Sequence, residues 1–257
     1  MHLSSRFASD ESFAFAEVSL GDNDSRGSRS LMNQSRAFNI SKVAKKIKRF
    51  LKGESFVYEV GHIELPRGGI GFINGINNDF EEAQSYALRL SEYGGGVKIS
   101  HVYNATHSIL VDVAECALGY YGIETPPIQI LQDQWEDFVA MHEPEEKFLQ
   151  ICHSQGALHV KNALLAVTES IRKRIKVLAI APAAIIPREL CCESWNYASM
   201  DDFVSLFDIE GMDLYADQLI LLDRHADASL WDHDFCSPTY QEVIEKCVMQ
   251  YINSCKS

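Results

Sequence analysis

The sequence predicts an α/β fold with a mainly parallel central sheet and helices on both of its faces. Short, continuous apolar runs alternate with segments of helical periodicity, a pattern typical of strands buried on both sides. Turn residues separate these segments. The apolar run at 148–153 stops at a serine, and a helical pattern follows at once. This run therefore predicts a strand, a sharp turn and a helix in succession.

The totals fit one α/β domain with additional residues at its N-terminus. The chain has 257 residues, of which 46% are hydrophobic and 23% are charged, as in ordinary globular proteins. No apolar run approaches the ~20 residues of a membrane helix. The first residues lack the apolar core of a secretory signal. We therefore expect a cytoplasmic protein, or one that a specialised machine exports.

Charge and cysteine usage exclude several classes of partner and cofactor. The formal net charge is −13, from 36 acidic and 23 basic residues, and such a surface repels nucleic acid. The seven cysteines include no C-x-x-C pair, so neither a disulfide framework nor a zinc site is expected. No glycine-rich phosphate-binding loop is found. We expect no metal and no cofactor.

The N-terminal part divides into two segments. Residues 1–40 are rich in Ser, Asp, Asn and Arg and predict a disordered leader. Residues 41–54 predict a basic amphipathic helix that Ser41 can cap and Gly53 can end. Its apolar face could dock on the acidic body, or its basic face could bind an anionic membrane or a host protein. The basic residues are Lys42, Lys45, Lys46, Lys48, Arg49 and Lys52.

The α/β domain is expected over 55–257. Strands are expected at 56–60, 63–65, 70–73, 97–103, 148–153, 175–181, 194–198 and 219–222. Helices are expected at 80–93, 109–120, 128–141, after the serine turn, and at 239–251. Gly61-His62 predicts a hairpin between the first two strands. Asp79 can cap the first helix, and Gly94-Gly95-Gly96 can end it. Pro126-Pro127 breaks the chain before the helix at 128–141.

The serine turn has the composition of a nucleophile elbow. Such a turn lifts the Ser154 oxygen out of the sheet and aims the N–H of Gln155 at an oxyanion. Gly156 lets the helix and strand approach closely, whereas Cys152 occupies the position where the motif has its other glycine. The alternative is a helix that begins with a serine cap.

A serine nucleophile requires a base, and the base requires an acid that orients it. Asp202 follows a predicted strand and is the favoured acid, with its neighbour Asp201 as the alternative. His233 lies just before the last helix and is the favoured base, with His225 as the alternative. Two surface histidines in an acidic loop remain the competing interpretation of this segment.

An oxyanion hole needs a second backbone N–H beside that of Gln155. Asn74-Gly75-Ile76 follows an early strand, so the N–H of Gly75 or of Ile76 is expected to supply it. The alternative is that Asn-Gly is simply a turn signal. His153 is expected to point away from the pocket.

These features resemble the α/β-hydrolase fold of lipases and esterases. The resemblance rests on Cys152-His153-Ser154-Gln155-Gly156, on Asp202 and on His233. It implies a three-layer sandwich. A further resemblance, to uncharacterised proteins of chlamydia-like bacteria, covers the region from Ser55 to the C-terminus and not the leader. It implies an intracellular bacterial origin and delivery into a host cell. The stretches that carry it are Phe72-Ile73-Asn74-Gly75-Ile76-Asn77, Tyr103-Asn104-Ala105-Thr106-His107, the elbow, Ala179-Ile180-Ala181-Pro182-Ala183-Ala184 and Ser237-Pro238-Thr239-Tyr240.

The leading functional hypothesis is a serine hydrolase that acts on an ester, thioester or lipid through an acyl-enzyme on Ser154. An acyltransferase would use the same site. A protein that binds a host partner on a hydrolase scaffold is the hypothesis from another class.

Overall fold

A computed structural model describes residues 54–76, 78–105 and 125–256. All of them belong to one compact unit, Lys46–Ser257. The predicted leader, the basic segment up to Gly53 and the helix expected at 109–120 lie outside the described residues.

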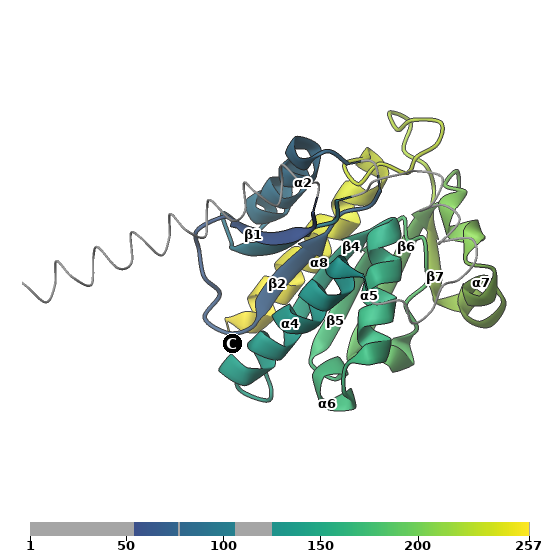
Figure 1. The fold of residues 1–257 in the computed structure, drawn as a ribbon. Helices are drawn as coiled ribbons and strands as arrows, with labels where there is room; N and C mark the ends of the chain where they lie inside the picture. The colour runs from purple at the N-terminus through teal and green to yellow at the C-terminus, as the bar shows by residue number, and fades with distance from the viewer. Residues whose placement is uncertain (1–53, 77, 106–124, 257) are drawn as a thin grey trace, which may run out of the picture. The chain divides into compact units, whose positions relative to one another are not determined.

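The described residues form the helices and strands shown in Figure 1. The strands are β1 (Phe56–Val60), β2 (Gly69–Ile73), β3 (Ile99–Tyr103), β4 (Phe148–His153), β5 (Ile175–Ile180), β6 (Glu193–Ser199) and β7 (Leu219–Leu222). The α-helices are α2 (Phe80–Tyr93), α4 (Pro126–Met141), α5 (Gln155–Ala166), α6 (Glu169–Arg172), α7 (Ile209–Tyr215) and α8 (Pro238–Cys255). Short 3₁₀ turns are η1 (Arg188–Leu190), η2 (Val204–Phe207) and η3 (Ala216–Gln218).

The strands form a single seven-stranded sheet in the order β1-β3-β2-β4-β5-β6-β7. Every neighbouring pair is parallel except β1 with β3, which is antiparallel. The parallel strands therefore end at one edge of the sheet, where the loops that follow them meet. With helices on both faces, this is an α/β-hydrolase-like three-layer sandwich.

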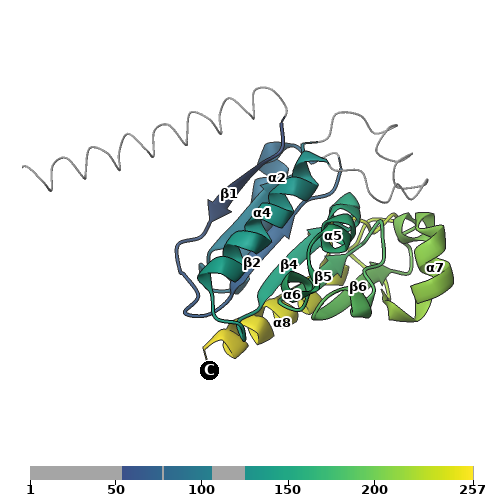
Figure 2. The same cartoon turned by 60° about the horizontal axis from the view of Figure 1, so that its bottom comes forward.

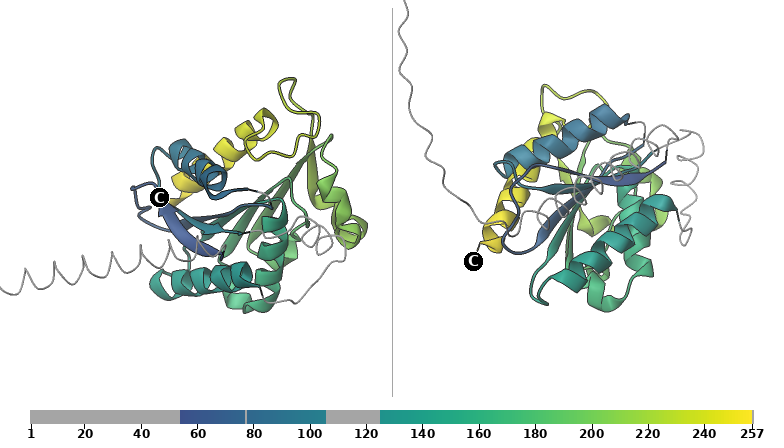
Figure 3. Two further views of the ribbon diagram at one scale, coloured as in Figure 1. Left: turned by 45° about the horizontal axis from the view of Figure 1, so that its top comes forward. Right: turned by 60° about the vertical axis from the view of Figure 1, so that its left-hand side comes forward.

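Two hydrophobic cores hold the three layers together. One core lies under α2 and α8 and contains the fully buried Phe72 and Tyr240. The other lies under α4 and α5, which pack side by side (Figure 2), and contains Trp135. The two helix layers lie on opposite sides of the sheet in the left-hand view of Figure 3. Since both faces are covered, the central strands read as continuous apolar runs.

The hairpin predicted at 56–65 is wrong. β1 pairs with β3, forty residues further along the chain, and not with 63–65. Gly61 turns the chain with φ +79°, and the N–H groups of His62 and Ile63 both donate to the carbonyl of Gly96. Ile63 makes one isolated parallel bridge to Val97. Residues 62 and 63 therefore lie beside the segment just before β3 and do not form a strand that pairs with β1.

Helix ends follow the predicted caps, with two extensions. Asp79 caps α2 by accepting the N–H of Glu82, and Gly94 is its C-cap residue. α4 begins at Pro126, so the two prolines lie in its first turn and do not break the chain there. A proline fits that turn because its missing N–H would have no helical acceptor. α8 likewise begins at Pro238 and continues to Cys255, beyond the predicted end.

Candidate active site

Ser154 lies between β4 and α5 with backbone angles of φ 53° and ψ −126°. A positive φ costs a residue that has a side chain roughly 1–3 kcal/mol and persists only where neighbours enforce it. Here the Ser154 N–H donates to Ile180 at 3.2 Å, and its carbonyl accepts from Ala157 and Ala183 at 3.0 Å each. The strained turn is therefore bonded on both sides, as a nucleophile elbow requires.

Two glycines allow the backbone to close around this turn. A Cβ on Gly156 would lie 2.8 Å from the carbonyl oxygen of Ile73, so α5 packs directly on the end of β2. A Cβ on Gly75 would lie 2.6 Å from the Cβ of Ser154. Cys152 is fully buried in β4, and burial raises the pKa of its thiol. The missing glycine of the elbow is thus a packed core residue.

Three side chains meet at this turn through two hydrogen bonds. His233 Nε2 lies 2.9 Å from Ser154 Oγ, and His233 Nδ1 lies 2.9 Å from Asp202 Oδ2. The Asp202 carboxylate is almost fully buried and can only accept, so Nδ1 carries the proton. His233 Nε2 is then free to accept the Ser154 hydroxyl proton. The other Asp202 oxygen accepts the N–H of Val204, which fixes the carboxylate.

The alternative residues lie elsewhere. His225 is half-exposed, and its Nδ1 accepts the N–H of Asp227. Asp201 forms an ion pair with Arg224, with 2.7 Å between Oδ2 and Nε. The structure therefore brings His233 and Asp202, and not their alternatives, to Ser154.

The Asn74-Gly75-Ile76 turn lies against the serine from the end of β2. Gly75 contacts Ser154, and Ile76 lines the same hollow as Ser154 and Gln155. Gln155 occupies the first position of α5, where an N–H has no acceptor within the helix. The backbone of both segments therefore borders the space beside Ser154 Oγ.

His153 does not point away from the pocket as expected from the sequence. It lines the hollow beside Ser154, and its Nε2 donates to the carbonyl of His233 at 2.7 Å. Burial, followed by the nearby His233, lowers the pKa of His153 to about 3. The neutral ring therefore holds the His233 loop without adding a charge beside it. Elbow geometry predicted the wrong direction because the sequence does not show the His233 carbonyl that holds the ring.

These groups open into a cavity of about 330 Å³, which we call the site hollow. Ser154 and His233 are among the residues that line it. Its apolar wall residues are Ile76, Ala183, Val204 and Phe207. The remaining polar wall residues are Asn78, Glu82, Tyr86, His153, Gln155 and Asp234. A cavity that combines apolar walls with convergent polar groups is typical of a small-molecule site.

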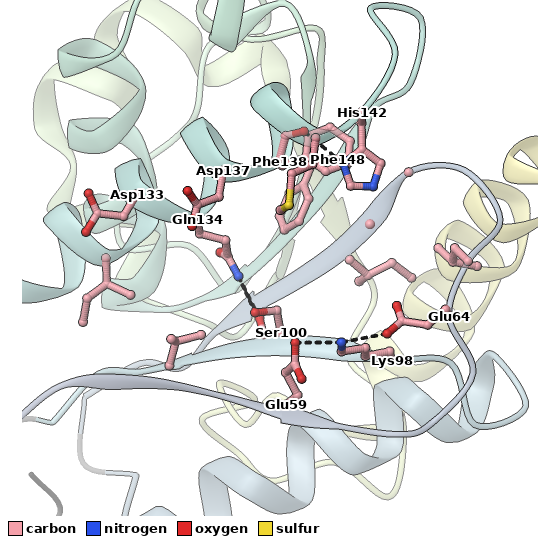
Figure 4. Close-up of a pocket in the computed structure, with 17 residues that line it drawn as sticks. Glu59, Glu64, Lys98, Ser100, Asp133, Gln134, Asp137, Phe138, His142 and Phe148 are labelled. Carbon is pink, nitrogen blue, oxygen red and sulfur yellow. Dashed lines mark hydrogen bonds and ion pairs between the residues drawn. The ribbon is translucent and has the colours of Figure 1, made fainter. Parts of the chain in front are cut away.

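A second, larger cavity of about 480 Å³ lies between α4 and the strands β1, β2 and β3 (Figure 4). We call it the α4–β1 hollow. Its carboxylates are Glu59, Glu64, Asp133 and Asp137. Lys98 forms ion pairs with Glu59 and Glu64 at 2.9 and 2.8 Å. None of the three side chains that meet at the elbow borders it.

The described part of the chain has neither a cluster of metal-ligating side chains nor a membrane-spanning helix. It contains no group of three or more His, Cys, Asp or Glu side chains that could hold a metal ion. None of its helices has both the length and the apolar character needed to cross a bilayer.

Residues 63–250 match the family described as "Protein of unknown function (DUF687)". The match covers more than half of the chain. The chain belongs to this family. A comparison of the DUF687 chain with curated proteins finds no match.

Solved structures similar to this DUF687 chain include several hydrolases. Est1E from Butyrivibrio proteoclasticus is 13% identical, with a TM-score of 0.47 over 79% of this chain and 94% of its own. XC6422 from Xanthomonas campestris, described as an a/b serine hydrolase without lid, is 10% identical, with a TM-score of 0.47 over 78% and 88%. The Bacillus cereus carboxylesterase is 11% identical, with a TM-score of 0.45 over 79% and 94%. The strand order and the elbow at Ser154 are the features that define the fold of this chain.

Proposed function

We propose that this protein is a serine hydrolase that cleaves an ester, thioester or lipid through an acyl-enzyme on Ser154. The observation that carries the proposal is the pair of 2.9 Å hydrogen bonds that join Asp202, His233 and Ser154 at a turn with positive φ. A serine hydroxyl is a poor nucleophile unless a base accepts its proton. His233 Nε2 is placed to be that base.

The reaction proceeds in two steps. Ser154 Oγ forms a bond to the carbonyl carbon as its proton passes to His233 Nε2, and Asp202 stabilises the resulting imidazolium. The bond to the alkoxide or thiolate leaving group then breaks, and His233 returns the proton to that group. In the second step His233 deprotonates a water, which attacks the acyl carbon and releases the acid and free Ser154.

The negative charge on the carbonyl oxygen needs donors in place before the reaction. Gln155 and Ile76 line the same cavity as Ser154, and Gly75 lies close to Ser154, so the N–H of Gln155 and the N–H of Ile76 or Gly75 are the proposed oxyanion hole. Loss of one such donor typically lowers kcat about 10²- to 10³-fold.

The wall of the site hollow supports a substrate with an apolar acyl group. Val204, Phe207, Ile76 and Ala183 line the cavity. Glu82 and Asp234 line it as well, and their carboxylates would repel an anionic substrate. An acyltransferase would use the same residues and differ only in the acceptor that resolves the acyl-enzyme.

The decisive experiment is labelling of the folded full-length protein with a fluorophosphonate probe. We expect modification of Ser154 in the wild type and none in Ser154→Ala. The matched control is Ser205→Ala, since Ser205 is buried nearby but donates to the carbonyl of Pro182. Folded wild-type protein that takes up no probe would refute the proposal.

One observation favours a second candidate, an interaction protein on a hydrolase scaffold that is delivered into a host cell. Large apolar side chains lie exposed on the loops that carry Asp202 and His233. They are Met200, Phe203, Leu206, Phe207, Leu230 and Trp231. Exposed apolar patches of this kind often bind proteins or membranes. The origin in chlamydia-like bacteria and the membrane or host-protein contact of the segment 42–52 are part of this candidate.

The two candidates differ in their dependence on the serine. If the second is correct, Ser154→Ala retains the biological effect, whereas Trp231→Ser with Phe203→Ser abolishes it. Liposome co-sedimentation with and without residues 1–53 tests the membrane contact, and equal pelleting would remove it.

A further inference from the structure

A buried chain of polar side chains runs from the edge of the sheet to the elbow. Its members, from β1 to α5, are Tyr58, His101, Asn74, Asn104 and Gln155. All five are buried, and Asn74 and His101 have no exposed surface at all. Burying polar groups is costly unless they are hydrogen-bonded, and here each side chain is bonded to the next.

The hydrogen bonds fix the direction of every proton in the chain. Asn74 Oδ1 accepts the N–H of Asn104 at 2.8 Å, so it is an acceptor, and the His101 Nε2 that lies 3.2 Å away must donate. His101 Nδ1 therefore accepts the hydroxyl of Tyr58 at 2.6 Å. Burial lowers the pKa of His101 to about 3, which keeps the ring neutral and this tautomer in place.

The amide nitrogen of Asn74 acts on the turn that follows it. Asn74 Nδ2 donates to the carbonyl of Gly75 at 2.9 Å and to that of Asn104 at 3.2 Å. In a trans peptide the carbonyl of one residue and the N–H of the next point in opposite directions. Holding the Gly75 carbonyl toward Asn74 therefore turns the N–H of Ile76 to the opposite side. Of the two donors left open by the sequence, Asn74 fixes that of Ile76.

The same chain of buried polar side chains also reaches Gln155, whose N–H is the other proposed oxyanion donor. Asn104 Nδ2 donates to Gln155 Oε1 at 2.9 Å, and Gln155 supplies the N–H that follows the serine. The end of β3 thus bonds both to the turn after β2 and to the first residue of α5.

We propose that Asn74, held by His101 and Tyr58, is a positioning residue that aims the Ile76 N–H at the oxyanion, while Asn104 holds Gln155 in register with it. This inference rests on the proposed function. It adds that both donors are set by one chain of side chains whose far end is the Tyr58 hydroxyl on β1.

The test compares Asn74→Ala with a matched control, Asn196→Ala, in the full-length protein. Asn196 is equally buried, and its amide also bonds backbone groups, namely the Ile186 N–H and the carbonyls of Ile186 and Gln218. p-Nitrophenyl acetate is the substrate, and the melting temperature is measured for each variant. We expect Asn74→Ala to lower kcat per folded molecule by about 10- to 100-fold with little change in KM. Asn196→Ala should lower the melting temperature without lowering kcat.

A second variant guards against loss of folding. Tyr58→Phe removes one hydroxyl from the far end of the chain and should lower kcat by about 2- to 10-fold, since a misaligned donor is weaker than an aligned one. The amide NMR resonance of Ile76 should shift in Tyr58→Phe and stay in place in Asn196→Ala.

The outcomes separate the two proposals. Folded wild-type protein that neither reacts with a fluorophosphonate nor turns over the ester would overturn the proposed function and this inference with it. An active wild type with an unchanged kcat and an unmoved Ile76 resonance in Tyr58→Phe, and an unchanged kcat in folded Asn74→Ala, would overturn the positioning role alone.

Discussion

The two hollows of this protein differ in a way that size does not reveal. The α4–β1 hollow is the larger, about 480 against 330 Å³, and holds more carboxylates. Its exposed Glu59 and Glu64 share Lys98, an arrangement that water screens. The site hollow instead ends at a serine in a strained turn, bonded to a histidine whose partner carboxylate is buried.

The comparison shows that the candidate catalytic residues lie where the parallel strands end, and not in the larger cavity. Ser154, Asp202 and His233 follow β4, β6 and β7, which are distant in sequence and share one sheet edge. The α4–β1 hollow is bordered by the opposite ends of β2 and β3 and by one helix. The first two predictions below therefore set a member of the group Ser154, His233 and Asp202 against a residue of the same type elsewhere.

The largest effect is expected for the two histidines. His233→Ala should lower kcat/KM for p-nitrophenyl acetate by at least about 10³-fold, because it removes the base. His142→Ala, in the α4–β1 hollow, and His225→Ala should each stay within about 2-fold. A fall in kcat/KM for His225→Ala as large as that for His233→Ala would contradict the assignment of His233 as the base.

A similar or smaller loss of activity is expected for the carboxylates. Asp202→Asn replaces the group that holds the proton on His233 Nδ1 and should lower kcat by about 10²- to 10⁴-fold with KM little changed. Asp137→Asn in the α4–β1 hollow should have no effect on kcat. Asp201→Asn loses its ion pair with Arg224 and should also leave kcat nearly unchanged. An equal fall in kcat for Asp201→Asn and Asp202→Asn would contradict this assignment.

The smallest effect concerns stability at acid pH. Burial lowers the pKa of His101 and His153 to about 3 and that of His159 to about 4, whereas unfolding restores the usual 6.5. The unfolded chain then binds more protons below pH 6.5, so stability is fully present above that pH and falls as the pH drops toward 4. At pH 5 each group costs up to about 2 kcal/mol.

Urea unfolding at pH 7.5, 6 and 5 measures this loss. His225→Gln, at an exposed position, is the control and should not alter the pH dependence. A free energy of unfolding that stays constant from pH 7.5 to 5 would show that the buried rings do not titrate on unfolding.

Much of the fold was predictable because its signals are local. Asp79 and Gly94 bound α2 as their capping chemistry requires, and the buried runs became parallel strands. The partner of β1 was not predictable, since hairpin and non-local pairing leave the same alternation in a strand.

Ser154, Asp202 and His233 were predictable from their order along the chain. The buried polar residues that position the turns beside them were not. Ser154, Asp202 and His233 each follow a strand, and the fold requires that order. Asn74 and Asn104 read as turn residues, and His101 as one residue inside a strand. Only the side-by-side pairing of β2 with β3 brings them together. Polar residues at equivalent ends of two predicted strands were the available signal.

The buried thiol of Cys152 determines how chemical modification of this protein should be interpreted. Burial hinders formation of its thiolate, the form that maleimides and iodoacetamide attack. Among the cysteines of the described residues, alkylation of the native protein should begin at the exposed Cys192. Modification of Cys152 would require β4 to open. The rate of that modification would therefore report how often the strand before Ser154 unfolds.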